Sequence, residues 1–150
     1  MMSNTRSFWI SLLLTFFLAS PALAQSGSER FGDYQVYYSV FNSTFVPADI
    51  AAIHGLVRGE DRALINISVT SAEGGLGQKA EVNGTATNLM QQAQPLDFQE
   101  INEGGTYYYI APMRHTEEEV YNFRVNVKPE GAERAFELTF SQKMYTEPSH

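Results

Sequence analysis

Apolar and polar residues alternate along most of the chain after its first 24 residues. Every second position is apolar from 63 to 69 and again from 121 to 127, with mostly polar side chains between them. A period of two is that of a β-strand with one buried face. Similar segments near residues 29–41, 80–89 and 136–141, separated by turn-forming residues, predict an all-β chain of about seven strands.

A β-hairpin near residues 96–113 is the most distinctive of these elements. Its turn falls at Glu103-Gly104-Gly105, because glycine reaches positive φ without steric cost. The returning strand carries three consecutive tyrosines at 107–109, so both of its faces are aromatic. Since tyrosine is enriched where proteins bind partners, we expect Tyr107 and Tyr109 to form an outward-facing binding patch.

One short helix interrupts the strand pattern. Proline is well tolerated in a first helical turn, so Pro47 marks the start of a helix that runs to about Ile53. Gly55 is placed to end it. The fold class that these elements predict is an antiparallel, immunoglobulin-like β-sandwich of about seven strands with one short helix. A small up-and-down β-barrel is the alternative architecture.

The first 24 residues have the features of a secretory signal peptide. Arg6 supplies a basic start, residues 8–18 are mostly apolar, and Ala22-Leu23-Ala24 fits a cleavage site after Ala24. The apolar run is about half of the roughly 20 residues that a membrane span needs. We therefore expect export to a bacterial periplasm, no membrane insertion after cleavage, and a single domain over residues 25–150, enough for a substantial core.

Composition excludes several classes of function. The chain has no cysteine, so disulfides, thiol catalysis and cysteine metal sites do not occur. Removing Arg6 from the ten basic residues leaves nine against 17 acidic ones, a net charge of −8 for the mature chain. Nucleic acids and anionic lipid surfaces are recognised by basic faces, so neither is an expected partner.

No motif in the sequence points to catalysis or to a bound metal. His54, His115 and His150 lack the spacing of a metal-binding motif, and the glutamates at 117–119 are not part of a calcium loop. No GxSxG motif is present to supply a serine nucleophile. The sequence thus offers no catalytic, metal-ligating or cofactor-binding residue, and we expect a protein that is not an enzyme.

Four separated blocks resemble a known family of secreted gammaproteobacterial proteins. The blocks are FNSTFVPADIAAIHGLVR (residues 41–58), RALINISV (62–69), NLMQQAQPLDFQEINEGGTYYYIAP (88–112) and YNFRVNVKPEG (121–131). Together they resemble the DUF4426 family over nearly all of the mature chain. The resemblance implies a periplasmic all-β domain, and it implies no activity or site residues, because the family has no assigned function.

We therefore expect a periplasmic binding or accessory domain that recognises a protein or envelope component. Recognition would use the aromatic strand face or an exposed edge strand. One alternative is a carrier of a small molecule or lipid in an internal pocket. A hydrolase with a site assembled from distant residues is the least favoured alternative.

Overall fold

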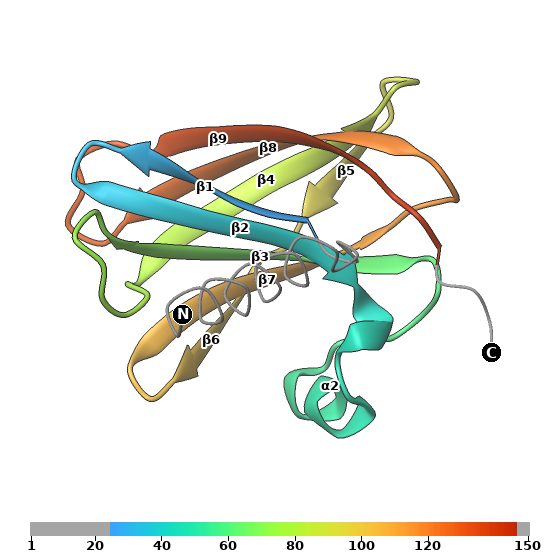
Figure 1. The fold of residues 1–150 in the computed structure, drawn as a ribbon, viewed down its shortest axis with the longest axis horizontal. Coiled ribbons are helices and arrows are strands. Elements are labelled where there is room, and N and C mark those ends of the chain that lie inside the picture. The colour runs from blue at the N-terminus through green and yellow to red at the C-terminus, as the bar shows by residue number, and fades with distance from the viewer. Residues whose placement is uncertain (1–24, 147–150) are drawn as a thin grey trace, which may run out of the picture.

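Two antiparallel sheets face each other across the core (Figure 1). The structure, a computed structural model, describes residues 25–146, and the expected signal peptide lies outside them. The strands within this range are β1 (Gln25–Phe31), β2 (Tyr34–Asn42), β3 (Arg62–Ser71), β4 (Ala80–Asn88), β5 (Ala93–Leu96), β6 (Gln99–Glu103), β7 (Thr106–Arg114), β8 (Val120–Pro129) and β9 (Phe136–Lys143).

The strand order confirms the sandwich. One sheet has the order β1-β2-β3-β7-β6 and the other β5-β4-β8-β9, so the strands divide between two sheets instead of closing into the alternative barrel. The described residues form nine strands where about seven were expected. The difference arises because the segment before Phe41 is itself a hairpin, β1–β2, and because the short strand β5 precedes β6.

The alternating segments supply the core, as their period predicts. The apolar positions of β3, from Ala63 to Val69, and of β8, from Phe123 to Val127, are essentially inaccessible to solvent. Burying a side chain such as Val or Ile stabilises a fold by about 1.5–3 kcal/mol. The space between the sheets is therefore filled by packed side chains from both inner faces.

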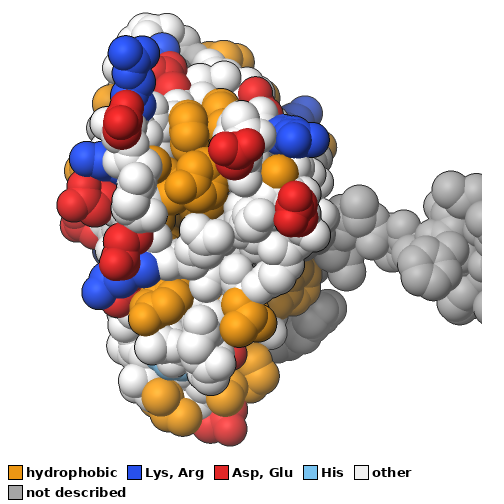
Figure 2. Space-filling model, turned by 90° about the vertical axis from the view of Figure 1, so that its left-hand side faces the viewer, with side chains coloured by type: hydrophobic (Ala, Val, Ile, Leu, Met, Phe, Trp, Pro, Cys, Tyr) orange, Lys and Arg blue, Asp and Glu red, His pale blue; other side chains and the backbone are white. Residues whose placement is uncertain are grey.

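Stacked aromatic rings join the two sheets near β1 and β9. The ring of Tyr38 on β2 stacks on that of Phe140 on β9, with centroids 4.2 Å apart. Closer to the β1–β2 turn, Phe31 stacks on Phe136 at 5.2 Å. Figure 2 looks onto this end of the molecule and shows apolar side chains set among charged ones.

The connection between β2 and β3, residues 43–61, extends away from the sandwich and returns to it, and is named here the excursion. It contains a 3-10 turn, η1 (Ser43–Phe45), and the helix α2 (Ala48–His54), which confirms the predicted helix. Gly55 ends α2 with a left-handed backbone, φ 66°. At the base of the excursion, the Ser43 hydroxyl donates to the Gly59 carbonyl at 3.0 Å and accepts from the Gly59 amide at 2.9 Å.

Neither α2 nor any other helix in residues 25–146 has the length and hydropathy needed to cross a bilayer.

Candidate binding groove on the four-stranded sheet

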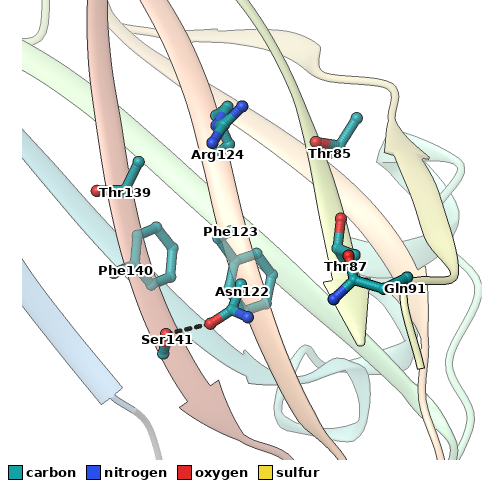
Figure 3. A pocket seen from close by; sticks show the side chains of 9 residues that line it. All are labelled: Thr85, Thr87, Gln91, Asn122, Phe123, Arg124, Thr139, Phe140 and Ser141. Atoms are coloured by element: carbon teal, nitrogen blue, oxygen red, sulfur yellow. Dashed lines mark hydrogen bonds between the residues drawn. The ribbon is translucent and has the colours of Figure 1, made fainter. Parts of the chain in front are cut away.

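A shallow groove of about 690 Å³ crosses the outer face of the four-stranded sheet. It spans β4, β8 and β9 and reaches the loop between β4 and β5 (Figure 3). Its lining residues are Thr85, Thr87, Gln91, Asn122, Phe123, Arg124, Thr139, Phe140 and Ser141. The outward side chains among them are polar because their neighbours along each strand, such as Ala86 and Leu138, point into the core.

The strand register places these polar side chains in two rows across the sheet. One row is Thr87, Asn122 and Ser141, and the next is Thr85, Arg124 and Thr139. Neighbours within a row lie on adjacent strands, about 4.8 Å apart. The groove floor is therefore a regular array of hydroxyl and amide groups.

The single guanidinium group among the lining residues is already paired. Arg124 Nε lies 3.2 Å from the Glu137 carboxylate on β9, and both side chains are largely exposed. Solvent screens such a pair, so it contributes little to stability. It does leave the groove close to electrically neutral within an acidic protein.

The loop between β4 and β5 closes one end of the groove and is held by a buried asparagine. Asn88 is 5% exposed, and its side-chain oxygen accepts from the backbone amides of Met90 and Gln92 at 3.0 and 2.9 Å. Its amide nitrogen donates to Gln92 Oε1 and to Glu119 Oε1, each at 2.7 Å. These four bonds fix the loop, and they fix Gln91 on the groove side of it.

A second hollow, of about 390 Å³, lies near the β7–β8 loop and contains His115. His115 is 3% exposed, and its Nδ1 lies 3.2 Å from the Thr116 carbonyl oxygen. Its Nε2 has no hydrogen-bond partner among the described residues.

Hydrogen bonds from Thr116 Oγ1 and Asn88 hold the pKa of Glu119 below its usual value. The hollow is a polar junction that joins the loop before β3 to the β7–β8 loop, since the His115 backbone amide donates to the Asp61 backbone carbonyl at 3.0 Å.

The residues considered for metal binding are not brought together. His54 ends α2, His115 lies in the second hollow, and His150 lies outside the described residues. Within residues 25–146 no three side chains of His, Asp or Glu are arranged to hold a metal ion.

The expected orientation of Tyr107 and Tyr109 is wrong. Tyr109 is 4% exposed, and its hydroxyl accepts from the Ala80 amide at 2.7 Å. Tyr107 is partly buried against the same core, so the outward pair of β7 is Tyr108 and Ile110. In antiparallel pairing Tyr109 lies opposite Ile67, whose side chain is in the core, and this places the odd-numbered tyrosines on the inner face.

Sequence reasoning missed the groove, although part of its signal is present. Polar residues occupy alternate positions at 85 and 87, at 122 and 124, and at 139 and 141. Each pair alone is what any strand with one solvent-facing side shows. Only the register, which no local pattern specifies, aligns the three pairs into rows.

These observations define a class of protein: a β-sandwich with a neutral, polar groove on one outer sheet face. Residues 28–147 match the family model described as a domain of unknown function, DUF4426. The chain belongs to the DUF4426 family, as its sequence blocks indicate.

One solved structure agrees with this assignment, and two others share the fold. A DUF4426 family protein from Pseudomonas aeruginosa PAO1 is 31% identical, with a TM-score of 0.74 over 82% of this chain and 97% of that chain. A copper-bound variant of FetP from uropathogenic Escherichia coli strain F11 is 10% identical, with a TM-score of 0.62 over 82% of this chain and 99% of that one. FetP as isolated after expression in the E. coli periplasm is 12% identical, with a TM-score of 0.61 over 83% and 98%. The FetP likeness shows a shared fold alone. No functionally curated protein matches the chain.

Proposed function

We propose that this protein is a non-enzymatic binding domain of the periplasm whose groove takes an uncharged glycan of the cell envelope. The observation that carries the proposal is the pair of polar rows on β4, β8 and β9. Hydroxyl and amide groups both donate and accept hydrogen bonds, which suits a ligand rich in hydroxyl groups.

The electrical balance of the groove favours a neutral ligand over a charged one. Arg124 is paired with Glu137, so no free cation among the lining residues awaits an anionic ligand. A cationic ligand would be recognised by acidic side chains, and none lines the groove. Hydrogen bonds to uncharged groups are then the interactions available.

The lining also argues against a protein partner at this face. Protein interfaces gain most of their affinity from a few buried anchors, typically Tyr, Trp or Arg. The outward side chains here are Thr, Ser, Asn and Gln with one ion-paired arginine. Recognition of a protein through an edge strand, by β1 or β6 of one sheet or β5 or β9 of the other, stays a separate prediction.

The carrier alternative finds no support in the core. Val36, Ile65, Val125 and other inner-face side chains are fully buried and fill the space where an internal ligand would lie.

The signal-like segment before Gln25 supports a periplasmic location. We expect the protein in a periplasmic fraction to begin at Gln25. Mass spectrometry of the intact chain tests this expectation, and a retained residue 1–24 segment would contradict it.

The test of binding is isothermal titration of the mature chain with neutral oligosaccharides of glucose and of N-acetylglucosamine. We expect at least one to bind, and we expect sulfated dextran not to bind because the chain is acidic. The double variant Thr85→Val, Thr139→Val removes two hydroxyls at nearly constant shape and should weaken binding. Ser39→Ala, on the outer face of β2 in the other sheet, is the matched control. Failure of every neutral oligosaccharide to bind overturns the proposal.

A further inference from the structure

The β4–β5 loop at the end of the groove covers residues 89–92, and Leu89, Met90 and Gln91 form its turn. Its turn is closed by the Gln91 amide, which donates to the Asn88 carbonyl at 3.1 Å. On the return side, the Asn88 amide donates to the Gln92 carbonyl at 3.1 Å. Gln91 has a left-handed backbone, with φ of 64°. Hairpin loops of this length commonly place one residue in that conformation, and glycine suits it because it has no Cβ.

The residues in this loop are not those that a turn requires. Glutamine takes the left-handed position, where a side chain carries a steric cost. Leu89 and Met90 occupy the turn corners, where Pro, Asp, Asn, Ser or Gly are favoured, and they are 68% and 79% exposed. Departures from local rules that gather in one exposed loop are typical of functional sites.

The surrounding hydrogen bonds stabilise the backbone conformation of the β4–β5 loop. The four side-chain bonds of Asn88 hold both flanks of the loop, and Glu119 anchors Asn88 to the neighbouring β7–β8 loop. A backbone in a sparsely populated conformation persists where its surroundings over-determine it. The loop therefore holds the backbone of Gln91 in one orientation.

This orientation directs the Gln91 side chain to the groove. Gln91 is one of the lining residues, and Figure 3 shows its side chain extending from the loop alongside Thr87. Thr87 begins the row that continues through Asn122 and Ser141. The primary amide of Gln91 adds two donors and an acceptor at the end of that row.

We propose that Gln91 is a ligand-contacting residue of the groove, and that the β4–β5 loop is a preformed clamp for one end of a neutral glycan. Its amide nitrogen donates to a ligand hydroxyl and its amide oxygen accepts from another. Preorganisation reduces the entropy lost on binding, which explains why the strained backbone is kept. This inference rests on the proposed function, because it names a residue that acts in the same groove.

The test compares two glycine substitutions at strained positions. Gln91→Gly removes both the strain and the side chain, so we expect Tm to rise by about 2 °C while affinity for the neutral oligosaccharides falls about fivefold or more. The control is Glu118→Gly, since Glu118 also has a left-handed backbone, φ 57°, but does not line the groove. It should raise Tm to a similar extent and leave affinity unchanged. Gln91→Glu keeps the shape but loses the donors, and should also weaken binding.

The outcomes separate this inference from the function on which it rests. If the wild-type chain binds an oligosaccharide and Gln91→Gly and Gln91→Glu bind it equally well, the role of Gln91 is overturned and the proposed function stands. If the wild-type chain binds none of the oligosaccharides, the proposed function is overturned and this inference falls with it. A higher Tm in both glycine variants, with lower affinity in Gln91→Gly and unchanged affinity in Glu118→Gly, supports the clamp.

Discussion

The hydroxyl of Tyr109 donates a hydrogen bond to the Glu100 carboxylate 2.8 Å away. Tyr109 lies on β7 and Glu100 on the neighbouring β6. The same hydroxyl accepts from the Ala80 amide at the start of β4, in the opposite sheet. One phenol thus links three strands across the sandwich, and burial raises its pKa to about 12.

This link predicts a response to high pH. The pKa of Tyr109 is about 12 in the folded protein against 10.0 for the free side chain, so folding favours the neutral phenol. Its contribution is fully present below pH 10 and is lost as the pH rises toward 12, by up to about 3 kcal/mol in total. Tyr109→Phe should reduce this alkaline loss. It should also lower stability near neutral pH by about 1–2 kcal/mol, because the Ala80 amide loses its acceptor.

Urea unfolding at several pH values between neutral and alkaline measures both effects. Tyr37→Phe is the control, because Tyr37 is 46% exposed and should change neither. Equal behaviour of the two variants would contradict the buried role of Tyr109.

A second prediction concerns acid. Thr116 Oγ1 and Asn88 donate hydrogen bonds to the Glu119 carboxylate and lower its pKa from 4.5. A depressed pKa gives stability that is present above pH 4.5 and is lost as the pH falls through the folded-state pKa. Glu119→Gln should lower Tm at neutral pH and flatten its fall in acid, since an amide has one acceptor oxygen and cannot accept from both Thr116 and Asn88 as the two carboxylate oxygens do.

Thermal unfolding by circular dichroism between acidic and neutral pH tests this prediction. Glu60→Gln, at an exposed position before β3, serves as the control. An acid limb that is as steep in Glu119→Gln as in the wild type would show that other groups govern acid unfolding.

The close approach of β4 and β8 makes a third prediction. A Cβ at Gly84 would lie 2.6 Å from the Arg124 carbonyl oxygen, and backbone cannot swing aside as a side chain can. Gly84→Ala should therefore destabilise the protein by about 2 kcal/mol or more. Gly59→Ala should be milder, since the nearest atom is on the flexible Arg62 side chain at 3.2 Å. Similar unfolding midpoints in urea for the two variants would contradict this account.

A fourth prediction concerns the excursion between β2 and β3. Ser43→Ala removes both hydrogen bonds to Gly59 at a position that is 1% exposed. We expect a loss of about 1–2 kcal/mol, because two backbone groups of Gly59 lose their partner. Hydrogen exchange should speed up between residues 44 and 58, while the amides of β3 and β8 stay protected. Uniformly faster exchange would show that the hydrogen bonds between Ser43 and Gly59 support the whole sandwich.

Period and turn chemistry predicted the elements whose two faces differ. β8 buries every second side chain, as its alternation indicates, and β3 buries its alternating apolar set together with Leu64 and Thr70 on the other face. Pro47 and Gly55 bracket α2 as expected. The family resemblance is likewise confirmed. In each case the information is local to the segment.

The failures fall where local information is absent. β7 carries tyrosine on both faces, so its sequence does not indicate which face is buried, and pairing with β3 decides it. Asn88 lies near the end of the segment predicted as a strand at 80–89, and its partner Glu119 is 31 residues away. The groove depends on two strand registers at once, β4 with β8 and β8 with β9. Tertiary pairing, which no short window contains, sets all three features.

The two hydrogen bonds between Ser43 and Gly59 also affect where this chain can accept inserted residues. These hydrogen bonds close the excursion at its base, next to the pair formed by Asn42 and Ala63. The pairing of β2 with β3 begins there and does not involve the residues of the excursion. Loop length itself has a small entropic cost. We therefore expect this connection to accept an inserted peptide tag or fluorescent label with the sandwich and its groove left intact.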